Sequence, residues 1–438
     1  MSKLTGIGIT VQQRVVLRNS GLFTSIGGLT TAARVTSLTA GTDYYWKVVY
    51  TNEAGAGSDS NTTQGSPSAI GDAFAGLANA NHSGVLHAED SSSMYVETDG
   101  DAGTTVTDGD NIGIWLDRSF GGDNSTGQTA AEYIAAQSNF LSATPGDWTQ
   151  NGNVGTFTYA NDEYTLTSSN SFAAVTRVEP ATAGRFYIVE VSASGATSAN
   201  KLVRVGDSGS VSRWGQTTSG SDINVTRLVY AVENDIRVQV SNNSSDLAND
   251  ITITATIKEL PGQHIVMPSD AARPIYRSAD GGYVEADGSA DSMPLTSMTQ
   301  TTDMNMALVM RTTDTDFELI SGETSTGDYI GRSEDGSSST TISANAGSPT
   351  ITVDDTALSG SARDDLHTDI ADDAWHKVEI EGADMSTSWT DGFNLCSNQD
   401  GSVVSSIKLK ALIAHDGTGM SAGDETDIAT WVDQLVPS

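Results

Sequence analysis

The sequence predicts an all-β, multi-domain protein built from antiparallel β-sandwiches. Short alternating runs of Val, Ile, Thr, Tyr and Phe recur along the chain, bounded by clusters of Gly, Asp, Asn and Ser, which is the pattern of sandwiches and barrels. Amphipathic stretches with the helical period of about 3.6 residues are nearly absent. The chain has 438 residues, of which 37% are hydrophobic, enough for several small cores in about two to four domains.

The composition excludes several classes of partner. The formal net charge is -34, so the surface repels nucleic-acid phosphates and anionic membranes. No run approaches the roughly 18 to 20 apolar residues of a membrane span, and the first residues lack the apolar core of a signal peptide. The single cysteine, Cys396, permits neither an intrachain disulfide nor a cysteine-based metal site. We expect a protein that is made in a cytoplasm, binds no nucleic acid and does not insert into a membrane.

The N-terminal residues 1–62 contain predicted strands and turns. Leu38 and Tyr44, with the Gly and Asn residues that follow them, resemble the end of a fibronectin type III domain, in which the Leu and Tyr form a tyrosine corner. Such a domain usually takes about 90–100 residues. The missing strands are therefore either supplied by a neighbouring subunit at an open sheet edge, or absent from a compact, shortened sandwich. Residues 63–85 are predicted to be a linker.

Two distant segments carry the pattern around which the domain prediction is organised. They are Thr107–Ser119 (TDGDNIGIWLDRS) and Pro268–Asp291 (PSDAARPIYRSADGGYVEADGSAD). Together they resemble a pattern of bacteriophage virion proteins, in which an acidic loop and a Gly-x-Trp-x-Asp-x-Ser strand lead within a few residues into Ala-Arg-Pro and Gly-Gly-x-Tyr. Around the first segment the matching residues are Asp90, Ser91, Gly103, Thr104, Thr105, Val106, Gly109, Asp110, Gly113, Trp115, Asp117 and Ser119.

In that family the second segment opens a concanavalin-A-like, or laminin-G-like, jelly roll. Here roughly 150 residues separate Ser119 from Pro268, so we infer that a whole domain is inserted. Residues 86–120 are predicted to be the first segment of the laminin-G-like domain, and residues 262–438 its remainder. Residues 138–260 resemble a carbohydrate-binding-module-like jelly roll, and their length of about 120 residues suits a sandwich.

A few further elements are predicted. Trp375 and His376 resemble the Trp-His strand of laminin-G-like domains, which implies a core Trp and a rim His. Thr129–Gln137 is predicted to form a short helix. Ser421–Leu435 is predicted to form a terminal helix with Ser421 as its N-cap. The apolar face of that helix is expected to contain Ile428, Trp431, Val432 and Leu435.

No specific catalytic motif is present. The chain lacks a phosphate-binding loop, a His-Glu-x-x-His motif and a Gly-x-Ser-x-Gly motif, and no long β-helical repeat is visible. A glycosidase needs two positioned carboxylates, but the 56 Asp and Glu residues make any chosen pair arbitrary. We therefore assign no catalytic residues and expect no enzymatic activity.

Two sets of residues are candidates for binding. Exposed aromatic rings can stack on sugar rings, and the carbohydrate-binding candidates are Trp214, Tyr164 and Trp148. The resemblance implies a core position for Trp148, whereas Trp214 lies in a polar stretch that favours exposure. Calcium takes about six to eight oxygen ligands. The calcium candidates are four carboxylates that bracket one turn: Asp99, Asp101, Asp108 and Asp110. The alternative is that these carboxylates are solvated in the turn and bind no metal. No other cofactor is expected.

These features favour a non-enzymatic structural protein of a phage virion, displayed on the particle surface. It would be a tail fibre or adsorption appendage, or a head fibre or capsid decoration protein. The N-terminal domain would attach it to other virion proteins, and the jelly rolls would contact a host surface glycan. We expect a homo-oligomer, with a trimer as one form, although no heptads of a fibre shaft are visible. The first alternative is a free carbohydrate-binding lectin, and the second is a polysaccharide-degrading enzyme.

Overall fold

The computed structural model describes most of residues 84–436 and, before them, the backbone of five strands. Those strands are β1 (Gln12–Arg18), β2 (Thr24–Leu29), β3 (Tyr44–Asn52), β4 (Gly55–Ala56) and β5 (Thr63–Gly65). Within 84–436 the described part leaves out residues 97–102, 125–126, 142, 184, 196–199, 207–213, 232, 243–249, 268–272, 287–290, 292, 296–300, 315, 323–327, 359, 361, 387–388, 390–392, 396–405, 419 and 421, and the side chains of 169–171, 200, 214, 219 and 422–423.

The five N-terminal strands form one antiparallel sheet in the order β2-β1-β3-β4, with β5 paired to β3. Leu38, which was predicted to form the tyrosine corner with Tyr44, lies outside the described residues, and only the backbone of Tyr44 is described. The fibronectin-like character of residues 1–62 therefore stays a prediction.

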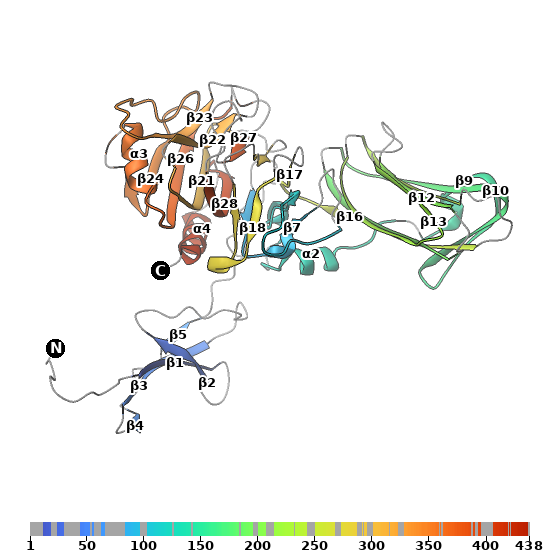
Figure 1. The fold of residues 1–438 in the computed structure, drawn as a ribbon, viewed down its shortest axis with the longest axis horizontal. Helices are drawn as coiled ribbons and strands as arrows, with labels where there is room; N and C mark the ends of the chain where they lie inside the picture. Colours follow the sequence, from blue (N-terminus) through green and yellow to red (C-terminus); the bar gives the residue numbers. More distant parts are fainter. Residues whose placement is uncertain are drawn as a thin grey trace.

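Residues 149–260 form one sandwich, which we call the 149–260 sandwich (green in Figure 1). Its eight strands are antiparallel, in the order β13-β12-β15-β10-β16-β11-β14 with β9 paired to β10. They enclose one core of aliphatic and aromatic side chains. The strands are β9 (Thr149–Ala160), β10 (Glu163–Pro180), β11 (Phe186–Ser194), β12 (Asn200–Gly206), β13 (Trp214–Ser219), β14 (Ile223–Tyr230), β15 (Asp235–Asn242) and β16 (Asp250–Leu260).

A second sandwich combines strands from both sides of that stretch, and we call it the two-segment sandwich. A large sheet in the order β18-β19-β28-β21-β26-β24-β25, with β6 on β28, packs on a small sheet in the order β20-β27-β22-β23. The large sheet contains β6 (Gly84–His87), β18 (Ile275–Arg277), β19 (Tyr283–Glu285), β21 (Met304–Thr312), β24 (Thr350–Val353), β25 (Thr356–Ala357), β26 (His376–Ala383) and β28 (Ile407–Asp416). The small sheet contains β20 (Pro294–Leu295), β22 (Asp316–Gly322), β23 (Tyr329–Glu334) and β27 (Phe393–Leu395).

Three α-helices cover these sheets in the described residues. The predicted terminal helix is confirmed as α4 (Ala422–Leu435), and its predicted N-cap, Ser421, lies outside the described residues. Its four predicted apolar residues are all buried, against the outer face of the large sheet. The predicted short helix is confirmed as α2 (Ala130–Ala136), which begins with a capping box between Thr129 and Glu132. Helix α3 (Arg363–Ile370) was not expected. None of the described helices combines the length and apolar character needed to cross a membrane.

The two halves of the sequence pattern lie side by side. The Gly109 N–H donates to the Tyr276 carbonyl oxygen at 2.9 Å, and the Tyr276 N–H donates to the Asp110 carbonyl oxygen at 2.8 Å. A short sheet continues this contact, in which β8 (Ile114–Trp115) pairs with both β7 (Met94–Tyr95) and β17 (Ile265–Val266). Segments on either side of the 149–260 sandwich therefore build one hydrogen-bonded unit.

Buried polar groups fix the points where the chain leaves and re-enters this unit. The Asp117 carboxylate accepts backbone hydrogen bonds from Val85 at 2.8 Å and from Gln263 at 2.9 Å. The Asp117 N–H donates to Nδ1 of His264 at 2.9 Å. Burial lowers the pKa of His264 to about 4, so the ring is neutral near pH 7 and Nδ1 can accept this bond.

Two expectations from the resemblance are wrong. Trp375, expected in the core, is only partly buried, and its Nε1–H donates to a carboxylate oxygen of Asp280 at 3.2 Å. His376, expected at the rim, is 8% exposed. Its position follows from two hydrogen bonds: Nδ1 lies 2.8 Å from Oδ2 of Asp354, and Nε2 lies 2.9 Å from Oδ1 of Asp372. These bonds compensate the imidazole for the water it loses.

Candidate functional site

One outward face of the 149–260 sandwich changes character along its strands. Strand β11 pairs with β14 on one side and β16 on the other, so outward side chains form rungs across three strands. At one end the two rungs are largely apolar, and Tyr230 and Lys258 complete them. Their buried apolar residues are Phe186, Ile188, Leu228 and Leu260. The next two rungs are polar, and they are Thr226–Glu190–Thr256 and Asn224–Ser192–Thr254.

The polar rungs follow from strand geometry. Successive side chains of a strand point to opposite faces, so the residues between the polar ones point inward. Val189 and Val191 of β11 belong to the sandwich core and are almost fully buried. The sequence of β11 therefore places an apolar row in the core and a row outside that switches from apolar to polar after Ile188.

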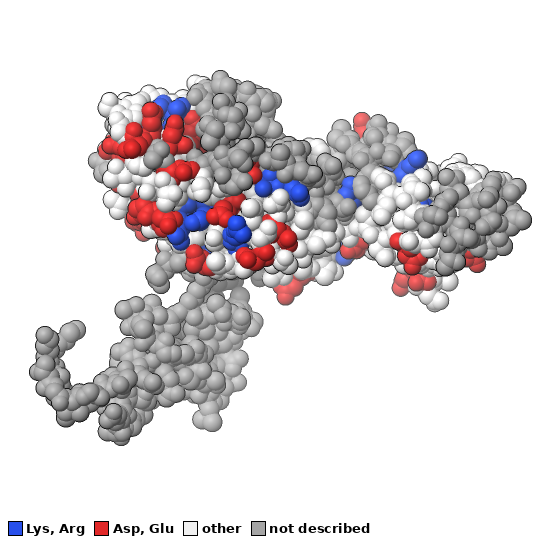
Figure 2. Space-filling model, viewed as in Figure 1, with Lys and Arg blue, Asp and Glu red and all other residues white. Residues whose placement is uncertain are grey.

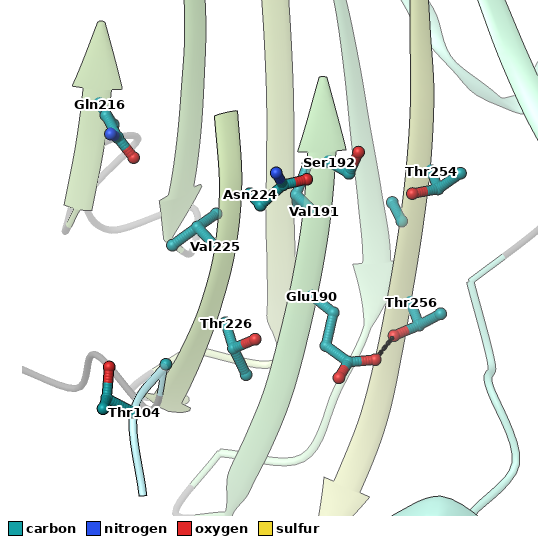
Figure 3. Close-up of a pocket in the computed structure, with 12 residues that line it drawn as sticks. Thr104, Glu190, Val191, Ser192, Gln216, Asn224, Val225, Thr226, Thr254 and Thr256 are labelled. Atoms are coloured by element: carbon teal, nitrogen blue, oxygen red, sulfur yellow. Dashed lines mark hydrogen bonds between the residues drawn. The ribbon is translucent and has the colours of Figure 1, made fainter. Parts of the chain in front are cut away.

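A groove of about 520 Å³ opens over the polar rungs (Figure 3). Strands β11, β14 and β16 supply its floor, and Gln216 of β13 borders it. Gly103 and Thr104 line it as well, although they belong to the two-segment sandwich. Figure 3 shows Thr104 beside the Thr226 end of the floor. The volume lies in the range of about 300–1,000 Å³ that is usual for small-molecule sites.

The groove offers many hydrogen-bonding groups and little charge. Among its described lining residues, Glu190 is the one charged side chain, and none of them carries an aromatic ring or a positive charge. The Thr256 hydroxyl donates to Oε2 of Glu190 at 2.8 Å, which holds the carboxylate against the floor (Figure 3). Hydroxyls and amides can both donate and accept hydrogen bonds. The arrangement suits an uncharged ligand that is rich in hydroxyl groups.

A shared apolar core holds the two sandwiches together beside the groove. It combines Tyr95, Ile114, Leu116 and Phe120 of the two-segment sandwich with the four buried apolar residues of the rungs described above. Helix α2, which Figure 1 shows between the two units, adds Tyr133, whose ring stacks on Phe120 at a centroid distance of 3.9 Å. Because this core is continuous, the position of the groove relative to Thr104 is set by close packing.

Two predicted carbohydrate-binding residues need correction. Trp148 and Tyr164 are each 3% exposed and belong to the core of the 149–260 sandwich. Their rings lie 5.0 Å apart, and Tyr164 stacks on Phe157 at 5.4 Å. Neither ring has a free face for a sugar, because both are used for core packing. The side chain of the third candidate, Trp214, lies outside the described residues, so its role stays a prediction.

Of the four calcium candidates, the structure describes two. Asp99 and Asp101 lie outside the described residues. Asp108 accepts a hydrogen bond from the Ser278 N–H at 2.9 Å. Asp110 accepts from the Thr107 hydroxyl and N–H, and these bonds lower its pKa. In the described part of the chain, no three His, Cys, Asp or Glu side chains are grouped to hold a metal. The two described carboxylates thus cap turns.

The residues of the groove were missed at the sequence level. The strands of this face belong to the jelly roll predicted for residues 138–260, but their polar outward residues look like those of any solvated sheet face. The polar alternation of Glu190 and Ser192 after two apolar outward residues was the available signal. It cannot reveal the contribution of Thr104, which comes from a distant segment.

The chain matches no family profile and no curated protein sequence. Structures of carbohydrate-binding modules are similar to part of it. One, solved in complex with beta-1,4-galactotriose, has 16% identity, covers 28% of this chain and 94% of its own, and gives a TM-score of 0.23. A CBM4 module has 15% identity, with 28% and 92% coverage and a TM-score of 0.21. A third, from a study of promiscuous specificity in the beta-sandwich superfamily, has 13% identity, with 57% and 85% coverage and a TM-score of 0.22.

Proposed function

We propose that this chain is a non-enzymatic structural protein of a phage-like particle that binds an uncharged carbohydrate in the groove of the 149–260 sandwich. The observation that carries the binding role is the pair of polar rungs under an open groove. A sugar presents donors and acceptors on every ring carbon that carries a hydroxyl. A floor of hydroxyls, an amide and one carboxylate can satisfy several of them at once.

The lining supports binding rather than hydrolysis. Glycoside hydrolysis by the common mechanism uses two carboxylates that face each other across the scissile bond. The described lining of the groove offers one, Glu190, and Thr256 already hydrogen-bonds it. A carboxylate held in this way can accept hydrogen bonds from sugar hydroxyls. The same negative charge disfavours acidic sugars such as uronic acids.

The particle role rests on the resemblance of the two pattern segments to phage virion proteins. The hydrogen bonds between Gly109, Asp110 and Tyr276 support it, because residues matching one family pattern form one structural unit. The groove lies over the polar rungs of the 149–260 sandwich and borders the two-segment sandwich at Gly103 and Thr104. We infer that the N-terminal part attaches the chain to other particle proteins and that the groove faces outward.

Binding can be tested on the full chain with a panel of neutral glucose, galactose and mannose trisaccharides, including beta-1,4-galactotriose, and with trigalacturonic acid as the anionic comparison. Titration calorimetry should detect at least one neutral trisaccharide and no trigalacturonic acid. Asn224→Ala and Thr254→Ala should each weaken that binding about three- to tenfold, the cost of one lost hydrogen bond.

The matched control is Thr252→Ala. Thr252 lies two residues before Thr254 on the same outward face of β16 but does not line the groove, so this variant should bind like the unaltered protein. The carbohydrate proposal fails if none of the neutral trisaccharides binds, or if Thr252→Ala weakens binding as much as Thr254→Ala. Tighter binding of trigalacturonic acid than of every neutral sugar would overturn the uncharged class.

Cryo-electron microscopy of purified particles tests the particle role separately. Density for the chain at the tail would favour an adsorption appendage, and density on the capsid would favour a head fibre or decoration protein. Absence of the chain from particles would contradict the particle role and favour a free carbohydrate-binding lectin. Release of reducing sugars from the neutral panel would contradict the non-enzymatic role.

A further inference from the structure

We infer that the carbohydrate groove is a composite site, in which the two-segment sandwich supplies a wall at Gly103–Thr104 that helps select the ligand. This inference rests on the proposed carbohydrate binding. A single sandwich presents its outward sheet face to open solvent. Here the polar rungs end beside a segment of a second unit, so a ligand seated on them also meets Thr104 (Figure 3).

The wall is anchored to the two-segment sandwich by its backbone. The Val96 N–H donates to the Thr104 carbonyl oxygen at 2.9 Å, and the Val106 N–H donates to the Met94 carbonyl oxygen at 3.1 Å. Val106 itself is 3% exposed and belongs to the core of the two-segment sandwich. The Thr104 backbone is therefore tied to Val96 and lies two residues before the buried Val106, while its own side chain is exposed.

The distance between wall and floor is set by a short strand that contacts both units. Strand β7 contains Met94 and Tyr95, whose side chains point to opposite faces. Met94 is buried in the core of the two-segment sandwich, and Tyr95 in the core shared with the 149–260 sandwich. Val96, the residue that follows β7, donates to the Thr104 carbonyl oxygen, so the wall is tied to a strand that packs against both units.

The chemistry of the wall fits the floor. Thr104 adds a hydroxyl, which donates and accepts hydrogen bonds, opposite a floor whose charge is the Glu190 carboxylate. Gly103 adds no side chain and so leaves room for a sugar ring. A ligand that fills the groove would be contacted from the β14 side by Thr104 and from below by the polar rungs. Recognition would then depend on both sandwiches.

The test uses the full chain and the neutral trisaccharide of the panel above that binds it. Thr104→Trp would fill the groove with an indole ring and should weaken binding by about tenfold or more. Thr104→Val keeps the shape, removes the hydroxyl and should weaken binding about threefold. Thr105→Trp is the matched control, because Thr105 is exposed and adjacent but does not line the groove. It should leave binding unchanged.

The outcomes separate this inference from the function on which it rests. If Thr254→Ala weakens binding but both Thr104 variants bind normally, the composite site is wrong and the carbohydrate groove stands. If the unaltered chain binds no trisaccharide, the proposed function itself fails. If Thr105→Trp weakens binding as much as Thr104→Trp, the effect reflects a disturbed segment, and the wall is not a ligand contact. Normal circular dichroism and thermal midpoints must accompany each variant for the expected result to count.

Discussion

At the scale of single residues, Asp117 joins the points where the chain leaves and re-enters the two-segment sandwich. Its carboxylate is fully buried and accepts four hydrogen bonds, from the N–H groups of Val85, Ser119 and Gln263 and from the Ser119 hydroxyl. Burial raises the pKa of Asp117, although the hydrogen bonds act to lower it. Gly262 lies so close that an added Cβ would meet Oδ2 of Asp117 at 2.5 Å. Position 262 therefore has no room for a side chain beside the Asp117 carboxylate.

We predict that Asp117→Ala destabilises the two-segment sandwich by about 3–5 kcal/mol, because several buried N–H groups lose their acceptor together. Differential scanning calorimetry measures the effect as a lower unfolding midpoint. Asp110→Ala is the control: Asp110 is a turn carboxylate whose bonds to Thr107 are exposed, and its loss should cost less than about 1 kcal/mol. Equal effects of the two substitutions would show that burial of Asp117 is not what matters.

At the scale of elements, a histidine ties strand β26 to its neighbours. His376 opens β26, and its two ring nitrogens face Asp354 in the turn between β24 and β25 and Asp372 after helix α3. Both nitrogens can donate to carboxylates only when the ring is doubly protonated. Burial opposes this charge, but the hydrogen bonds to Asp372 and Asp354 prevail and raise the pKa of His376 above 6.5. The bond to His376 in turn lowers the pKa of Asp372.

The raised pKa fixes the sign of a pH effect. The charged ring contributes stability that is fully present below pH 6.5 and is lost as the pH rises through the raised pKa. We predict that His376→Gln destabilises the two-segment sandwich by about 1 kcal/mol at pH 5.5, a modest value because both carboxylates are half exposed. The loss should be smaller at pH 8.5.

Thermal midpoints of the variant and the unaltered chain at the two pH values measure this difference. His367→Gln serves as the control, since its nearest carboxylate, Asp335, lies 3.9 Å away and is exposed. A nuclear magnetic resonance titration of His376 that gave a pKa at or below 6.5 would contradict the double hydrogen bond.

The sequence predicted elements best where one face of a strand is buried and the pattern is regular. The alternating apolar runs predict strands, and one such run, Met304–Thr312, forms β21. The length of β10 cannot be predicted in this way, because Ser168–Ser171 has the composition of a turn, whereas the strand runs through it and pairs with β9 with shifts of register between Thr167 and Ala173. The groove was missed for a different reason. Its floor could be predicted as strands, but the wall at Thr104 is brought to it only by packing between units.

At the scale of the whole molecule, the net charge of -34 is a source of repulsion that salt can screen. Figure 2 shows acidic side chains in red spread over the described part of the visible face, with basic groups between them in places. The screening distance falls from about 30 Å at 0.01 M salt to about 10 Å at 0.1 M. Repulsion between distant carboxylates should therefore weaken over this range, while close ion pairs persist.

We predict that raising sodium chloride from about 0.01 to 0.3 M increases the thermal midpoint by about 2–4 °C, the shift expected for roughly 1 kcal/mol in a unit of this size. Choline chloride at equal ionic strength should act equally if screening is the cause. A midpoint that falls with salt would mean that attractive ion pairs outweigh the net charge.

Comparing calcium chloride with magnesium chloride at matched ionic strength tests whether Asp99 and Asp101 belong to a calcium site. Extra stabilisation by calcium alone would reveal a specific site, because screening depends on charge and not on the identity of the ion.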